Sequence, residues 1–108
     1  VRPVPKGAHE ALLDEPNLAR AYNPAESLIP MFITGTYTGS VPAAPAKAPV
    51  FAIAVNGVVR GTARPFPFDG RIHWGALVDP KSIRTGKNKL GIYRVQGKRL
   101  IPIGSNQG

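Results

Sequence analysis

The dipeptide Asn56-Gly57, set between two runs of β-type residues, restricts the fold more than any other feature of the sequence. In the run that precedes it, Phe51, Ile53 and Val55 alternate with alanines. Asn-Gly is the strongest short signal for a β-hairpin, because both central residues of a type I′ turn need a positive φ. The sequence therefore predicts an antiparallel hairpin centred on this dipeptide, with the three larger side chains on one buried face.

Further β-type runs recur at intervals of about 8–12 residues, with turn residues between them, which is typical of a sandwich or barrel. Their ranges are 28–39, 71–78, 89–95 and 99–103. We expect an all-β fold, an antiparallel and jelly-roll-like β-sandwich over residues 27–108. Its expected core residues are Phe32, Phe51, Ile53, Val55, Ile72, Trp74, Val78, Ile83, Leu90 and Ile92.

Prolines set the expected limits of regular structure. Pro65 and Pro67 follow the hairpin and are expected to end its pairing. Pro16 interrupts the one weak helical signal near the N-terminus, and a proline inside a helix costs about 3 kcal/mol. We therefore expect residues 1–26 to form a poorly structured or short-helical arm. The Pro/Ala-rich residues 40–49 are expected to form an extended connection between two strands.

Composition and motifs exclude several chemistries. The chain has no Cys, which excludes disulfides, thiol nucleophiles and cysteine-bound metals. His9 and His73 lack spaced partners for a metal, and no serine lies in a Gly-X-Ser-X-Gly motif. No apolar run approaches the ~20 residues of a membrane helix. We therefore expect a non-catalytic chain with no cofactor, no metal and no transmembrane segment.

Positive charge is concentrated in the second half of the chain. The net charge is +8, and residues 49–108 carry ten Lys and Arg against two Asp. Strand alternation places Arg60 and Arg64 on one face, with Arg71 and His73 together on the next strand. Such a basic face could hold an anionic glycan or another envelope polymer. Trp74 could stack on a sugar ring, although it alternates with apolar residues as a core tryptophan would.

These considerations give five candidate ligand-binding residues: Arg60, Arg64, Arg71, His73 and Trp74. Sheets that bind nucleic acid usually present exposed aromatic side chains, whereas the phenylalanines here occupy mostly positions expected to face the core. We therefore do not expect nucleic acid as a partner. Exposed aromatic side chains would favour sugar binding, and an exposed apolar patch would favour docking to a neighbouring domain.

Three segments together carry a resemblance to known families: residues 52–57, the strand around Trp74, and residues 83–93 with their Gly86-Lys87-Asn88 turn. This order resembles the jelly-roll accessory domains attached to glycoside hydrolases. The span 27–95 is also similar to extracytoplasmic β-sandwich segments of bacterial membrane-anchored hydrolases of the sulfatase and alkaline-phosphatase superfamily. No catalytic motif of either family is present.

The resemblance implies a non-catalytic accessory or interaction domain of a larger bacterial envelope protein, located in the periplasm or at the cell surface. Its partners would be other domains of the same parent chain. The alternative is a binding module that holds an anionic glycan or other polyanion on its basic sheet face.

Overall fold

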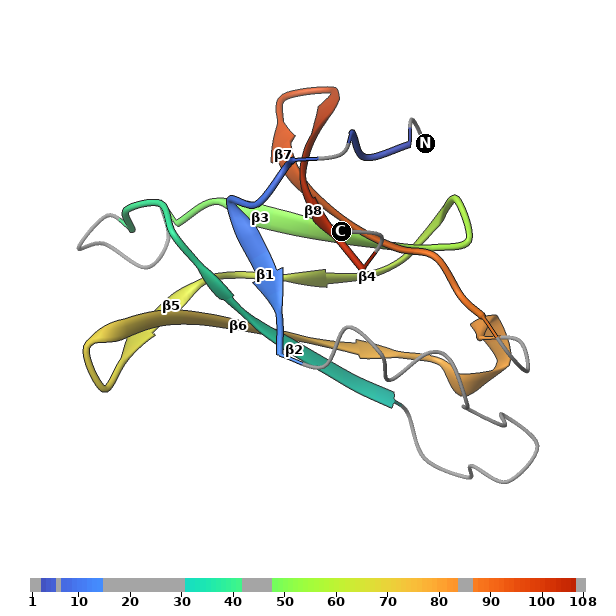
Figure 1. Cartoon of the computed structure of the whole chain (residues 1–108), viewed down its shortest axis with the longest axis horizontal. Helices are drawn as coiled ribbons and strands as arrows, with labels where there is room; N and C mark the ends of the chain where they lie inside the picture. Colours follow the sequence, from blue (N-terminus) through green and yellow to red (C-terminus); the bar gives the residue numbers. More distant parts are fainter. Residues whose placement is uncertain (1–2, 6, 15–30, 42–47, 84–86, 107–108) are drawn as a thin grey trace.

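Two antiparallel four-stranded sheets pack face to face in the computed structural model, which describes residues 3–5, 7–14, 31–41, 48–83 and 87–106. Figure 1 shows one sheet above the other, with β3 in the upper layer and β6 in the lower. Sheet A has the strand order β1-β2-β6-β5 and sheet B the order β4-β3-β7-β8. The strands are β1 (Ala11–Leu13), β2 (Met31–Tyr37), β3 (Val50–Val55), β4 (Val58–Ala63), β5 (Phe66–Phe68), β6 (Arg71–Val78), β7 (Leu90–Gln96) and β8 (Arg99–Ser105). The predicted all-β sandwich is confirmed.

The connectivity rests on consecutive strands that pair within one sheet. β1 pairs with β2, β3 with β4, β5 with β6 and β7 with β8. The non-consecutive pairs β2–β6 and β3–β7 then join these units into two sheets. The strand order therefore departs from the expected jelly-roll pattern, in which Greek keys separate most consecutive strands. Two-residue turns explain three of these pairs, β3–β4, β5–β6 and β7–β8, because a loop this short keeps both strands of a hairpin in the same sheet.

The predicted Asn56-Gly57 turn is confirmed, with φ values of 51° and 87°. Asp69 and Gly70 form a second turn of this kind, with φ values of 52° and 76°. This second turn joins β6 to β5, a strand that the sequence analysis missed. Pro67 does not end the pairing because β5 lies at the edge of sheet A, where a strand tolerates the loss of a backbone donor.

The core lies between the sheets and is centred on aromatic side chains. Phe51 and Trp74 have relative exposures of 0% and 1%, and their rings meet edge to face at 6.5 Å. Tyr37 contacts Phe51 in the same geometry at 5.0 Å. Eight of the ten predicted core residues are buried. Ile72 is only partly buried, and Phe32 is 59% exposed, so its placement in the core was wrong.

The N-terminal segment belongs to the sandwich. Ala11–Leu13 pairs with residues 35–37 of β2 as an edge strand of sheet A, and no helical turn is present there. Upstream, Val4 packs on the outer face of sheet B against Ala52, Ala54 and Tyr93. The segment predicted as an arm therefore contributes a strand to one sheet and a cover to the other. Residues 15–26 of that arm, and residues 42–47 of the predicted connection, lie outside the described residues.

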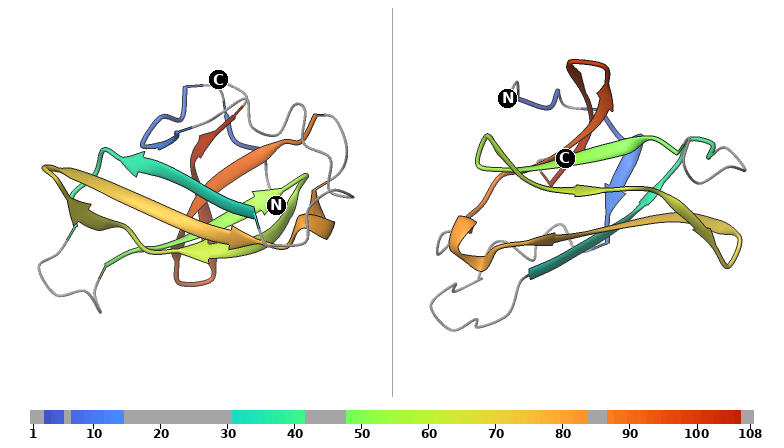
Figure 2. Two further views of the ribbon diagram at one scale, coloured as in Figure 1. Left: turned by 90° about the horizontal axis from the view of Figure 1, so that it is seen from below. Right: turned by 180° about the vertical axis from the view of Figure 1, so that it is seen from behind.

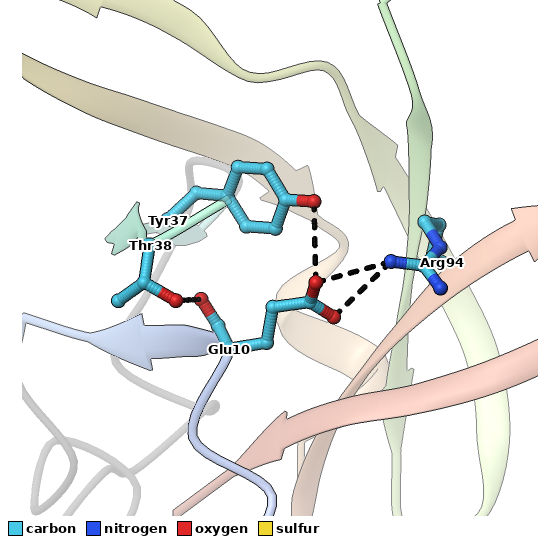
Figure 3. Close-up of polar contacts among 4 residues, drawn as sticks. All are labelled: Glu10, Tyr37, Thr38 and Arg94. Carbon is cyan, nitrogen blue, oxygen red and sulfur yellow. Dashed lines mark hydrogen bonds and ion pairs between the residues drawn. The ribbon is translucent and has the colours of Figure 1, made fainter. Parts of the chain in front are cut away.

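An ion pair joins this segment to sheet B at one end of the sandwich (Figure 3). Arg94 of β7 donates from Nη1 to both carboxylate oxygens of Glu10, at 3.1 and 3.2 Å. The hydroxyl of Tyr37 also points at this carboxylate, at 3.5 Å. The backbone carbonyl of Glu10 accepts hydrogen bonds from the amide and hydroxyl of Thr38, at 2.8 and 3.0 Å. Glu10 therefore links β2 in sheet A to β7 in sheet B.

Asparagines hold the other end of the sandwich. Asn88 is buried and accepts a 2.9 Å hydrogen bond at Oδ1 from Nδ2 of Asn56, in the β3–β4 turn. Nδ2 of Asn106 donates to the Asn88 carbonyl at 2.9 Å, and Oδ1 of Asn106 accepts from the Leu90 amide at 2.9 Å. The start of β7 is thus fixed between a hairpin tip and the C-terminal segment. Asn88, the asparagine of the Gly-X-Asn motif in the sequence, therefore has a structural role.

Candidate binding face

The outer face of sheet A carries large apolar side chains that the described part of the chain leaves exposed. Phe32, Phe66, Phe68 and Leu77 have relative exposures of 59%, 49%, 66% and 63%. The left panel of Figure 2 looks onto this side of the sandwich, with β2 and β6 toward the reader. We call this surface, together with Arg71 and His73, the aromatic face.

Strand register explains why these side chains share one face. In β6, Trp74, Ala76 and Val78 are buried, so the alternate residues Arg71, His73 and Leu77 point outward. Cross-strand partners lie on the same side of a sheet. The partners of these outward residues are Phe68 for Arg71, Phe66 for His73 and Phe32 for Leu77.

A glycine in β6 makes room for one of the rings. A Cβ atom added at Gly75 would lie 2.6 Å from Cζ of Phe32, so the tip of this ring lies over the glycine. An aromatic ring that covers a neighbouring strand's glycine shields backbone which would otherwise be open to water. The Phe32 side chain therefore extends from β2 over the backbone of β6 at Gly75.

His73 lies between the two phenylalanines of β5. Its ring is stacked on Phe66 with centroids 6.0 Å apart at 30°, and it meets Phe68 edge to face, also at 6.0 Å. Nε2 of His73 lies 3.1 Å from the carbonyl oxygen of Phe68. A carbonyl can only accept, so Nε2 donates this hydrogen bond. The imidazole is thus fixed as part of the aromatic surface.

The structure separates the five predicted binding residues. Arg71 and His73 lie together on the aromatic face, as expected from their alternation. Trp74, on the opposite side of the same strand, is 1% exposed, and its indole N–H donates to the Thr36 carbonyl at 3.0 Å. Its ring offers no surface to a ligand, which agrees with the core interpretation of this residue.

The two remaining candidates, Arg60 and Arg64, belong to sheet B and the connection that follows it. Arg60 has no partner directly opposite on β3, because the register shifts there by one residue. This β-bulge also breaks the alternation that the sequence predicted for β4. Arg64 donates from Nη1 to the Ala48 carbonyl at 3.1 Å and so holds a neighbouring segment. The predicted single basic face is therefore not what the strand arrangement produces.

The phenylalanines of the aromatic face were the functional candidates that the sequence analysis missed. Phe32 was placed in the core because of its size alone. Its alternation with Thr34 and Thr36 was the available signal, since a strand whose threonines face outward carries Phe32 on that same side. No comparable signal existed for Phe66 and Phe68, because two prolines concealed their strand.

The outer face of sheet B has an open pocket of about 340 Å³, where Val4 lies over Ala54, Gly91 and Tyr93. Burial raises the pKa of Tyr93 above its ordinary value of 10.0 by disfavouring the phenolate. Polar residues of the pocket, Tyr93 among them, take part in interactions within the chain. The pocket is therefore part of the packing between the N-terminal segment and the sheet.

The described residues contain no group of three or more His, Asp or Glu side chains placed to hold a metal ion. In that same part of the chain, no helix has the length and apolar character of a membrane span. In comparisons with known proteins, no family model, no curated protein and no solved structure matches the chain significantly. The aromatic face is therefore the candidate functional feature of the described residues.

Proposed function

We propose that this chain is a non-catalytic binding module, an accessory domain of a larger envelope protein outside the cytoplasm, which recognises its ligand on the aromatic face. The observation that supports this proposal is the exposure of Phe32, Phe66 and Phe68 on one side of one sheet. Their exposed fractions correspond to about 350 Å² of aromatic surface, if a whole side chain offers ~200 Å². Apolar patches of several hundred Å² are often functional in small soluble domains.

The position of the patch on regular structure also supports recognition. The three rings project from β2 and β5, which pair with β6 at the centre of the same sheet. Side chains on paired strands are held more rigidly than side chains on loops, so they bind with less loss of conformational entropy. This is the arrangement expected of a preformed binding surface.

A polyanion-binding module, the alternative from the sequence, has weaker support. It required Arg60 and Arg64 to share a sheet face with Arg71, and these residues belong to different sheets. A further cation, Arg94, is paired with Glu10. The high net charge remains available for long-range attraction of anions, but among the described strands Arg71 is the one cation that belongs to sheet A.

A thermal-shift screen tests the proposed function. The panel comprises neutral oligosaccharides, an anionic polysaccharide, oligo(dT) and an apolar peptide, because a ligand that binds the folded state raises its melting temperature. We expect at least one class to stabilise the wild type but not the F66A/F68A variant. V58A/V59A is the matched control, since it removes two exposed apolar side chains from the hairpin of sheet B.

Stabilisation that persists in F66A/F68A, or that disappears in V58A/V59A, would place recognition elsewhere on the molecule. The absence of stabilisation by every class would also contradict the proposal.

A further inference from the structure

From the size, charge and shape of the aromatic face, we infer that its ligand is a neutral saccharide chain, whose sugar rings stack on Phe32, Phe66 and Phe68. This inference rests on the proposed function and specifies the ligand. Three properties of the face carry it, and each excludes another class of occupant.

The face is too small to hold a folded protein stably. Its longest strand, β6, has eight residues, and the edge strands β1 and β5 have three each. At ~3.3 Å per residue and ~4.8 Å between strands, the face covers on the order of 400 Å². A stable protein interface buries about 800 Å² on each partner, so neither a second copy nor another domain is expected to bind through this face alone. A narrow ligand that lies along the rings fits its dimensions.

The described charges on this face are few and of both signs: Arg71, and Asp14, whose Oδ2 accepts a 2.8 Å hydrogen bond from the outward hydroxyl of Thr34 in β2. Arg71 is the described cation that lies opposite an exposed phenylalanine, since it pairs with Phe68 of β5. Proteins that bind single-stranded nucleic acid combine stacking rings with a groove of cations that follows the phosphates. Here the described cations on β4 and β7 are on sheet B, and Arg94 is already paired. The chemistry of the face therefore favours a ligand without charge.

The third property is the combination of flat rings with polar groups at their side. The tip of the Phe32 ring lies over Gly75, and Phe66 and Phe68 flank the imidazole of His73. A pyranose ring has apolar C–H faces and a border of hydroxyl groups. Its C–H faces match the phenylalanine rings, while the guanidinium of Arg71 can donate hydrogen bonds to the hydroxyl groups. Phe32 pairs with Leu77 and Phe68 with Arg71, positions that lie about 20 Å apart along β6 at ~3.3 Å per residue, a length that suits a short oligosaccharide.

Isothermal titration with neutral hexasaccharides tests the inference. The probes are linear hexamers of glucose, mannose and N-acetylglucosamine, with oligo(dT) titrated in parallel. We expect one saccharide to bind and F66A/F68A to weaken it about tenfold or more, since each aromatic contact contributes a factor of two to ten. The affinity should stay within about twofold between low and high salt, because no counterions are released.

Two variants control for loss of folding. V58A/V59A should bind like the wild type, since both valines lie on the β3–β4 hairpin of sheet B. Gly75→Ala retains all three phenylalanines but places a methyl group against the Phe32 ring, which must then move. We expect Gly75→Ala to weaken saccharide binding severalfold while the melting temperature changes little.

The outcomes separate this inference from the proposed function. No measurable binding of any hexasaccharide at millimolar concentration overturns the inference. If oligo(dT) binds instead, weakens steeply with salt and depends on Phe66 and Phe68, the saccharide assignment is wrong while a binding function of the face stands. If saccharide binding does not depend on these two residues, both are wrong.

Discussion

The outer faces of the two sheets differ in how much of their apolar surface the described chain covers. On sheet B, the outward residues Ala52, Ala54 and Tyr93 are 3%, 2% and 3% exposed, because Val4 and its neighbours cover them. On sheet A, the outward residues Phe32 and Phe68 are 59% and 66% exposed. The larger side chains are therefore on the face that the described chain leaves open. Since apolar surface is normally buried where the chain can bury it, this inversion is the basis of our proposal that sheet A binds a ligand.

Each outer face has a glycine beside an aromatic ring, and the two rings differ in how far they are covered. A Cβ atom added at Gly91 would lie 2.9 Å from the Tyr93 ring, as one added at Gly75 would lie 2.6 Å from Phe32. The Tyr93 ring is covered in turn by the N-terminal segment, whereas most of Phe32 meets solvent. An aromatic ring over a glycine is therefore packed under the N-terminal segment on sheet B and is exposed to solvent on sheet A.

The largest expected difference between the faces comes from truncating one aromatic side chain on each. Tyr93→Ala should lower the free energy of unfolding by about 3 kcal/mol, because it empties a covered site. Phe68→Ala should change it by no more than about 0.5 kcal/mol, because its side chain is mostly exposed. Urea denaturation of both variants measures the difference. Equal losses would mean that the aromatic face is a structural part of the fold.

A smaller effect is expected from the cover itself. Val4→Ser should reduce the free energy of unfolding by about 1 kcal/mol, since Val4 packs on Ala52, Ala54 and Tyr93. Leu12→Ser, on the open side of sheet A, is the matched control, and it should cost less because Leu12 is 41% exposed. The same urea experiment applies. A larger loss for Leu12→Ser would remove the distinction between a covered and an open face.

The ion pair that ties the covering segment to sheet B should contribute less still. Glu10→Gln removes the charge opposite Arg94 at a site where the two side chains are 37% and 31% exposed. Partly exposed ion pairs contribute about 0.5 kcal/mol or somewhat more, and salt screens them. The deficit of Glu10→Gln should therefore shrink in high salt. A deficit independent of salt would mean that packing, and not charge, is lost.

The smallest effect is confined to alkaline pH and concerns Tyr93. Because burial raises the pKa of its phenol, the folded chain keeps the proton at a pH where the unfolded chain, with a pKa of 10.0, releases it. The stability of the wild type should therefore decline as the pH rises above about 10 and through the folded pKa. Tyr93→Phe has no such proton, so its decline should be shallower. Parallel curves for both proteins would show that Tyr93 is not buried from water.

The sequence predicted those parts of the fold that depend on local chemistry. Asn56-Gly57 specified its hairpin through positive φ values, and β6 was correctly divided into a buried face with Trp74 and an outward face with His73. The prediction failed where the outcome depends on distant contacts. β1 exists because β2 offers it an edge, and β5 tolerates Pro67 because it is itself an edge strand.

The candidate site was predictable only in part, for the same reason. Arg71 and His73 were placed on the correct face by alternation, but no pattern in the sequence states which outer face the chain will cover. Val4, near the N-terminus, packs on the outer face of sheet B, so this face is covered and the outer face of sheet A is not. The predicted basic face failed because β4 with Arg60 and β6 with Arg71 belong to different sheets, a division that strand alternation cannot predict.

Nuclear magnetic resonance gives the most direct test of the claim that sheet A carries the recognition surface. Backbone amide shifts would be followed during titration with each of the neutral hexasaccharides. The account predicts that a binding saccharide shifts amides of β2, β5 and β6 around Phe32, Phe66 and His73, and leaves β3 and β7 unchanged. Shifts confined to sheet B, or the absence of shifts with every hexasaccharide, would contradict it.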